Sequence, residues 1–228
     1  MFRGIFVTGT DTNVGKTVVS AALMLRYRAE AALRYWKPIQ TGIEHDDDSA
    51  EVARLASPSA DEIFHGGVRL PHPVSPHLAA RLAGTRITVR RLVEELRDEQ
   101  NRRPHPSAVR WIVEGAGGLQ VPINERETMA DLILALHLPV IVVARSTLGT
   151  INHTVLTIEA LRRRMLRVAG VIMVGTPNEE NWKAIEHYGA VEVIAQMPLF
   201  DPFTPEALAQ WVTRDFDEGG SLFVAGLR

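Results

Sequence analysis

The 228-residue sequence contains no cysteine. This absence excludes disulfides, thiolate nucleophiles and zinc or iron–sulfur sites held by cysteine. An excess of one charge sign is also missing, because 25 lysines and arginines stand against 27 aspartates and glutamates, for a formal net charge of −2. No overall positive field therefore indicates nucleic acid as a partner.

Long hydrophobic runs are missing as well. The N-terminal apolar stretch is too short for the core of a signal peptide, and no run approaches the roughly 20 residues that cross a membrane. We therefore predict a cytoplasmic protein with no membrane partner. The composition, 46% hydrophobic and 23% charged, is typical of soluble globular proteins. The length favours one domain over residues 1–228.

Short runs rich in β-branched residues alternate with segments of helical character. We expect strands at residues 5–7, 34–39, 111–113, 139–143, 168–174 and 191–195. We expect helices at residues 15–32, 48–55, 88–103, 130–137, 149–164, 179–188 and 205–212. This alternation predicts a three-layer α/β fold, with a mostly parallel central sheet and helices on both faces. Residues 70–77, rich in proline and histidine, are expected to form an irregular insertion, and residues 215–228 indicate no role.

The first expected strand is followed by Gly9-Thr10-Asp11-Thr12-Asn13-Val14-Gly15-Lys16-Thr17, which opens the first helix. Backbone N–H groups and the positive helix end would cradle a phosphate there. Lys16 can reach the outer phosphates, and the Thr17 hydroxyl can bind Mg²⁺. The loop is one residue longer than the common G-x-x-x-x-G-K-[ST] pattern. The residues that we expect at the nucleotide are Thr12, Asn13, Val14, Gly15, Lys16, Thr17 and Val18.

The same region is similar to the signature of a known family. Val7 to Thr12, one variable residue and then Val14 to Thr17 resemble the opening motif of dethiobiotin synthetases, which tolerate the longer loop. The resemblance covers roughly residues 7–200. It implies a P-loop NTPase fold, ATP as a co-substrate and Mg²⁺ as the cofactor.

A second motif ends the second expected strand, at Trp36-Lys37-Pro38-Ile39-Gln40-Thr41-Gly42. Ligands bind at the carboxyl ends of parallel strands, although a lysine at such an end is by position alone more often solvated. The family resemblance implies that Lys37 is catalytic, together with Lys16, and that the Thr41 hydroxyl lies near the substrate.

Two acidic segments can supply metal ligands. Residues 45–51 hold three consecutive aspartates, and Asp48 is the expected N-cap of the helix that follows. The resemblance implies that an aspartate at this helix start binds Mg²⁺; we choose Asp48, while Asp46 and Asp47 stay open. It likewise implies that Glu114 shares the ion with Thr17. The glycines that follow the strand expected at residues 111–113 let the backbone approach the nucleotide. The residues expected at the nucleotide in this segment are Glu114, Gly115, Ala116 and Gly117.

Other motifs concern the substrates. The resemblance implies that a helix start contributed by a partner subunit binds the substrate carboxylate, which predicts a homodimer with its active site at the interface. The residues concerned are Gly149, Thr150, Ile151 and Asn152. Ser75 and His77 are secondary candidates near the substrate.

Loops after two late strands are expected to hold the base of the nucleotide. The residues expected there are Gly175, Pro198, Leu199 and Phe200. The family commonly has an Asn-Asp pair where this sequence has Val174-Gly175. Backbone groups of Gly175 or the Asn178 side chain are alternatives that could replace that pair at the base. The sequence does not decide between them, nor which base is bound.

The reaction implied by the resemblance closes a ureido ring on 7,8-diaminononanoate with CO₂ and ATP, through a phosphorylated carbamate. One alternative is a nucleotide-switch ATPase of the partitioning or septum-positioning type, but residues 9–14 lack the second lysine of those proteins. Another is an amide-forming enzyme such as the cobyrinate amidating group, which usually requires a nucleophilic cysteine. A binding-only relative is the third alternative.

Overall fold

The computed structural model describes residues 2–217, 219, 220 and 222 of the chain. The segment 215–228, to which the sequence assigned no role, therefore lies partly outside the described residues. None of the helices within the described part is long and apolar enough to cross a membrane.

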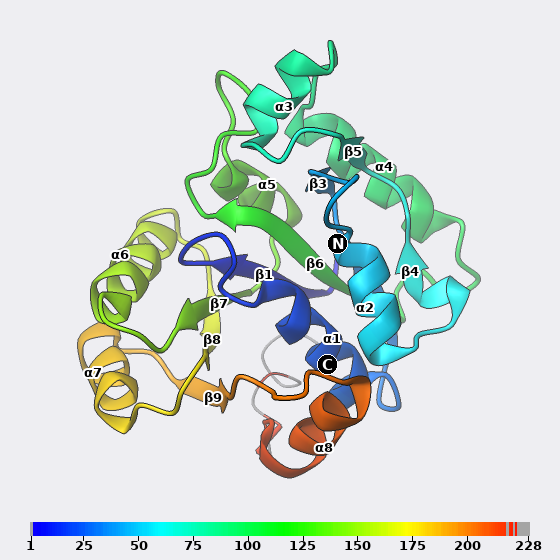
Figure 1. The fold of residues 1–228 in the computed structure, drawn as a ribbon. Coiled ribbons are helices and arrows are strands. Elements are labelled where there is room, and N and C mark those ends of the chain that lie inside the picture. The colour runs from blue at the N-terminus through cyan, green and yellow to red at the C-terminus, as the bar shows by residue number, and fades with distance from the viewer. Residues whose placement is uncertain (1, 218, 221, 223–228) are drawn as a thin grey trace.

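A seven-stranded sheet in which every pair of neighbours is parallel forms the centre of the molecule (Figure 1). Its spatial order is β4 (Ile63–Phe64), β2 (Ala32–Trp36), β6 (Val109–Gly118), β1 (Gly4–Gly9), β7 (Val140–Arg145), β8 (Val168–Val174) and β9 (Val193–Met197). Two shorter parallel strands, β3 (Ile39–Thr41) and β5 (Val68–Leu70), pair with each other outside this sheet. The central position of β1 places the loop that follows it in the middle of the carboxyl edge.

Helices cover both faces of the sheet. One face carries α1 (Lys16–Tyr27), α2 (Asp48–Ala56) and α8 (Pro205–Asp215), which also pack against one another. The other face carries α4 (Val89–Asn101), α5 (Met129–Leu136), α6 (Thr150–Arg163) and α7 (Glu179–Gly189). A short helix α3 (Pro76–Leu82) packs on β3, and a 3₁₀ turn spans Ala60–Glu62. Figure 1 shows α6 and α7 together beside β7, β8 and β9, whereas α4 and α5 lie nearer to β6.

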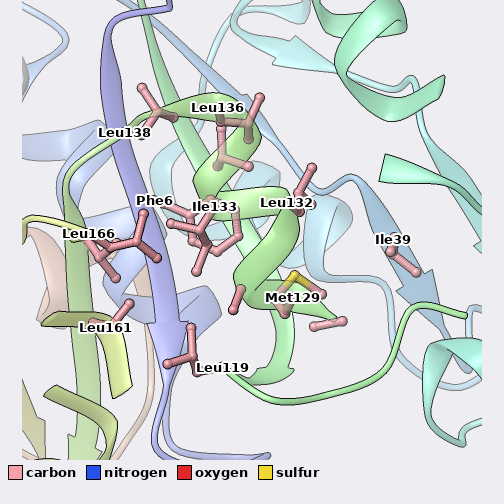
Figure 2. Packing of buried hydrophobic residues seen from close by; sticks show 14 of the residues in the cluster. Phe6, Ile39, Leu119, Met129, Leu132, Ile133, Leu136, Leu138, Leu161 and Leu166 are labelled. Carbon is pink, nitrogen blue, oxygen red and sulfur yellow. The ribbon is translucent and has the colours of Figure 1, made fainter. Parts of the chain in front are cut away.

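The strand residues divide between two hydrophobic clusters because successive side chains point to opposite faces. In β1, Phe6 belongs to the cluster under α4 to α7, while Ile5 and Val7 belong to the cluster under α1, α2 and α8. Figure 2 shows Phe6 beside Ile133 of α5 within the first cluster. Each large apolar side chain buried in this way contributes about 1.5–3 kcal/mol. The predicted three-layer fold is therefore confirmed.

The predicted elements are all present, with changes at their ends. The segment 34–39, expected as one strand, is divided: β2 ends at Trp36 and β3 begins at Ile39. Pro38 lies between them and has no N–H group to donate to a strand ladder. The first helix was expected to reach residue 32 but ends at Tyr27, because residues 28–30 are exposed and turn the chain back toward β2.

The predicted irregular insertion at residues 70–77 was wrong at both ends. Leu70 is the last residue of β5, and Pro76 opens α3, where proline is well suited to the first helical turn. A three-residue strand and a seven-residue helix are too short to show a periodic pattern, so sequence reasoning missed them.

Candidate active site

The phosphate loop lies between β1 and α1 at the carboxyl edge of the sheet (Figure 1). Gly15 precedes α1 with φ +96°, a left-handed conformation that glycine adopts without strain. No side chain caps this helix start, so its first N–H groups remain available to an anion. Lys16 folds back over the loop, and its Nζ donates to the Asp11 carbonyl oxygen at 3.1 Å.

The hydroxyl of Thr17, on the first turn of α1, joins two carboxylates. Its Oγ1 donates to Asp48 Oδ1 at 2.7 Å and is 3.0 Å from Glu114 Oε1. Asp48 opens α2 and Glu114 lies in β6, so these oxygen donors come from three separate elements. The family resemblance implied that these three residues share a metal ion, and the structure brings their side chains together.

The aspartate register differs in one respect from the sequence-based expectation. Asp48 was expected to be the N-cap of α2, but the N-cap is Asp47, whose side chain accepts hydrogen bonds from the N–H groups of Ser49 and Ala50. Asp47 has an extended backbone, as N-cap residues do. Because Asp47 takes the capping role, the Asp48 carboxylate is left to face Thr17 and the site.

Lys37 is buried between the two carboxylates, where its exposed fraction is 3%. Its Nζ lies 2.5 Å from Asp48 Oδ2 and 2.8 Å from Glu114 Oε1, and it donates to the Gly115 carbonyl oxygen at 3.1 Å. Burial by itself would lower the pKa of Lys37, but Glu114 and Asp48 outweigh it and the pKa is raised. The ammonium is therefore held charged in the cleft.

Lys16 behaves in the opposite way. Burial, reinforced by the positive charge of Lys37, lowers the pKa of Lys16 to about 8. Burial also opposes ionisation of Asp48, but Lys37 outweighs it and the pKa of Asp48 is lowered. The site thus combines a Lys37 side chain that is held charged, a Lys16 side chain whose charged form is disfavoured, and an Asp48 carboxylate that stays ionised.

The donor set of the cluster fits a hard divalent cation. Two carboxylates lie within hydrogen-bond distance of one hydroxyl, and Mg²⁺ takes oxygen ligands while keeping several waters or phosphate oxygens. Within the described part of the chain, no group of three histidine, cysteine, aspartate or glutamate side chains is placed to hold a metal by itself. The phosphates of a nucleotide would complete the coordination.

A cavity of about 690 Å³ opens above this cluster. The residues predicted for the site that line it are Thr12, Asn13, Gly15, Lys16, Thr17, Val18, Lys37, Thr41, Asp48, Glu114, Ala116 and Gly117. Ser75 lines it as well, and its hydroxyl lies 3.1 Å from His77 Nδ1. Val14 and Gly115 do not line it: Val14 is buried in the core, and Gly115 takes part through its carbonyl oxygen.

Two predicted groups lie away from this cavity. Gly149 is the N-cap of α6, and Thr150, Ile151 and Asn152 form the first turn of that helix. Gly175 follows β8, and Pro198, Leu199 and Phe200 follow β9, with the Gly175 N–H donating to the Met197 carbonyl oxygen at 2.9 Å. The Asn178 side-chain oxygen caps α7 by accepting from the Asn181 N–H, so that oxygen is already engaged.

Sequence reasoning missed several residues at the site. Gly42, His45, Pro73, Val74 and Val121 line the cavity. All of these except Val121 lie in segments that the sequence singled out, but none of the five was assigned a role. Tyr35 is the most informative omission, since its hydroxyl donates to Glu114 Oε2 at 2.9 Å. Burial and the neighbouring Glu114 raise the pKa of Tyr35 well above its ordinary value, so the hydroxyl stays protonated. Its place two residues before Lys37 was the only available signal.

Known proteins resemble the chain over most of its length. A family model described as an AAA domain matches residues 3–207. The ATP-dependent dethiobiotin synthetase BioD of Paramagnetospirillum magneticum is 51% identical over 207 residues, which cover 91% of this chain and 93% of that protein. The protein of the same name from Brucella ovis is 44% identical over 212 residues, covering 93% of each chain.

A similar fold is found among solved structures. A ParA family ATPase from Chlorobium tepidum TLS matches with a TM-score of 0.56, covering 93% of this chain and 98% of that chain, at 9% sequence identity. At that identity the likeness concerns the fold alone.

Proposed function

The chain belongs to the dethiobiotin synthetase family, and from that membership we propose that it closes a cyclic urea on 7,8-diaminononanoate with CO₂ and ATP. The observation that carries the proposal is the position of Lys37, buried against Glu114 and Asp48 beside the phosphate loop. A switch ATPase of the partitioning type would have a second lysine within residues 9–14, and this sequence has none there.

Phosphoryl transfer depends mainly on positioning and on neutralising charge. The N–H groups at the start of α1 would bind the phosphates of ATP, and Lys16 would turn from the Asp11 carbonyl oxygen to the outer phosphates. Thr17, Asp48 and Glu114 would hold Mg²⁺, which supplies positive charge to the phosphate oxygens when bound.

The chemistry has three balanced steps. One amine of the substrate adds to CO₂ and loses a proton, which gives a carbamate. A carbamate oxygen attacks the γ-phosphorus and the bond to ADP breaks, leaving a carbamic–phosphoric anhydride. The second amine attacks the carbonyl carbon, and phosphate leaves with the bonding electrons while the amine loses its proton.

Lys37 would stabilise the negative charge that develops during these three steps. Its ammonium would bind the carbamate and the oxygen that bridges carbamate and phosphorus, because an ion pair is strong where water is excluded. Thr41 lines the same cavity and would orient the diamine through its hydroxyl. No side-chain nucleophile is needed, in agreement with a sequence that has no cysteine.

The carboxylate of the substrate would bind at the start of α6 from a second subunit, at Gly149 to Asn152. Two features support this part of the proposal. The helix start has no side-chain cap, and the neighbouring Leu148 is fully exposed, with a relative accessibility of 101%. We propose a homodimer with the active site at its interface. The cytoplasmic location and the single domain stay predictions.

The base of ATP would lie near Gly175, Pro198, Leu199 and Phe200. Their loops follow β8 and β9 at the carboxyl edge that also holds the phosphate loop. A Cβ atom at Gly175 would lie 2.3 Å from Ser146 Oγ, so a side chain would disturb this turn. At Gly175, contacts to the base would therefore come from backbone groups.

Phosphate release with Mg·ATP and bicarbonate, in the presence and absence of 7,8-diaminononanoate, tests the proposal. We expect release that depends on the diamine, together with a product of the ring-closed mass. Release that ignores the diamine but rises with self-association or DNA would support the switch ATPases instead. If the protein binds nucleotide but releases no phosphate, the result would support a nucleotide-binding protein without this activity.

A further inference from the structure

Tyr35 lies in β2 and is fully buried, with an exposed fraction of 0%. Its hydroxyl donates to Glu114 Oε2 at 2.9 Å, across the boundary between neighbouring strands. A tyrosine ring buried in a core needs a partner for its hydroxyl, and here the partner is a carboxylate that is itself fully buried.

The two oxygens of Glu114 have different partners. Oε1 accepts from Lys37 Nζ at 2.8 Å and lies 3.0 Å from Thr17 Oγ1, at the edge of the cavity. Oε2 accepts from the Tyr35 hydroxyl and lies toward the core. Because the Tyr35 hydroxyl and the Lys37 ammonium donate to different oxygens of the same carboxylate, the plane of that carboxylate is fixed.

The Tyr35 ring is itself fixed by its surroundings. It belongs to the hydrophobic cluster under α1 and α2, together with Val52 and Ile112. The parallel register between β2 and β6 pairs Tyr35 with Ile112 and Trp36 with Val113. Glu114 follows Val113 in β6, so the Tyr35 hydroxyl has a fixed position against the Glu114 carboxylate.

We propose that Tyr35 is a positioning residue that holds Glu114 with its Oε1 oxygen turned to the metal ion and the nucleotide. The proposal rests on the metal role of Glu114 in the proposed function. Partners that hydrogen-bond a ligating side chain fix its orientation, and their loss typically costs about 10–100-fold in metal affinity or activity.

Direct metal binding tests this without turnover. Mn²⁺ replaces Mg²⁺, and its binding to the protein with ADP is followed by electron paramagnetic resonance. We expect Tyr35→Phe to raise the dissociation constant for Mn²⁺ about 10–100-fold. In assays with substrates, the half-saturating Mg²⁺ concentration should rise while kcat at saturating Mg²⁺ changes little.

Tyr27→Phe is the matched control. Tyr27 is equally buried, lies in the same hydrophobic cluster and also bonds a buried carboxylate, that of Asp217. We expect this variant to bind Mn²⁺ as the wild type does. Equal loss of Mn²⁺ affinity in both variants would overturn the proposal, because the effect would then reflect general loosening of the core.

A second pair of variants keeps the test valid if Tyr35→Phe does not fold. Position 35 is replaced by 4-aminophenylalanine, which keeps a donor, and by 4-methylphenylalanine, which has similar volume and no donor. Only the amino variant should bind Mn²⁺ like the wild type. Equal affinity in both would overturn the proposal.

The two proposals can fail separately. Mn²⁺ binding that depends on Tyr35, in a wild type that shows no diamine-dependent release, would support the positioning role and reject the proposed reaction. If the wild type shows diamine-dependent phosphate release and Tyr35→Phe binds Mn²⁺ as the wild type does, the proposed reaction is supported and the positioning role is rejected.

Discussion

Lys37 Nζ lies 2.8 Å from Glu114 Oε1, although 77 positions separate the two residues in the sequence. The cause is the parallel register of β2 and β6, which pairs Trp36 with Val113. The residues that follow this pair, Lys37 and Glu114, therefore lie side by side at the carboxyl edge of the sheet. Each residue alone would be costly to bury, and each supplies the charge that compensates the other. The strand pairing therefore builds the charged centre of the site.

Lys37→Ala should lower kcat strongly while leaving nucleotide binding intact. Removing one preorganised charge at the reacting atoms costs about 10²–10³-fold in kcat. The measurement is phosphate release with the diamine, beside ADP binding by calorimetry. Lys183→Ala, which removes an exposed lysine paired with Glu179 on α7, should behave as the wild type. Turnover of the Lys37 variant at the wild-type rate would contradict the assignment.

Asp47 and Asp48 should separate into a structural and a metal-binding role. Asp48→Asn should weaken Mg²⁺-dependent ADP binding with a small effect on unfolding. Asp47→Ala removes the N-cap of α2 and should lower the free energy of unfolding by about 1 kcal/mol, with Mg²⁺ dependence retained. Calorimetry and urea unfolding measure both quantities. If Asp47→Ala weakened Mg²⁺-dependent binding and Asp48→Asn did not, the assignment of Asp48 as the metal ligand would be wrong.

The exposed Leu148 should be part of a subunit interface. Leu148→Asp is expected to shift the protein from dimer to monomer and to raise KM for the diamine, because the α6 start would no longer reach a neighbouring site. Light scattering gives the mass in solution. Met165→Asp is the control, since Met165 is 93% exposed and lies just beyond the other end of α6. A fully active wild-type monomer would rule out the shared site.

Glu99 should stabilise the fold above mildly acidic pH. It is buried, accepts from Arg34 Nη1 at 2.5 Å and also bonds Arg103. Burial opposes its charge, but the two arginines outweigh burial and lower the pKa of Glu99 below its ordinary 4.5. The stabilisation is therefore complete above that ordinary value and is lost as pH falls through the lowered pKa of the folded state.

Glu99→Gln should lower the free energy of unfolding at neutral pH by about 3–5 kcal/mol, because it leaves the Arg34 charge buried without a negative charge to compensate it. The difference from the wild type should shrink below the lowered pKa. Urea unfolding at several pH values measures this. Glu94→Gln breaks an exposed pair with Arg90 and should change stability by less than about 1 kcal/mol. A pH-independent difference would reject the explanation.

Local signals determined the phosphate loop and the layer architecture. Residues 9–17 are contiguous, so the loop, the helix start and Lys16 follow from chain order alone. The alternation of apolar strands with amphipathic helices likewise specified a parallel sheet covered on both faces. Short elements were beyond this reasoning: β3, β5 and α3 span fewer residues than a periodic pattern needs.

The sequence by itself determined the phosphate loop and its place before the first helix, because that loop and its glycines are encoded over neighbouring positions. Tertiary structure decided the rest. It gave the N-cap of α2 to Asp47 and placed the Asp48 carboxylate against Thr17, through the backbone geometry at the start of that helix. It also brought Tyr35 to Glu114 and buried Lys37 between carboxylates, through strand pairing across positions far apart in the chain. Such contacts depend on register and burial, which no local pattern records.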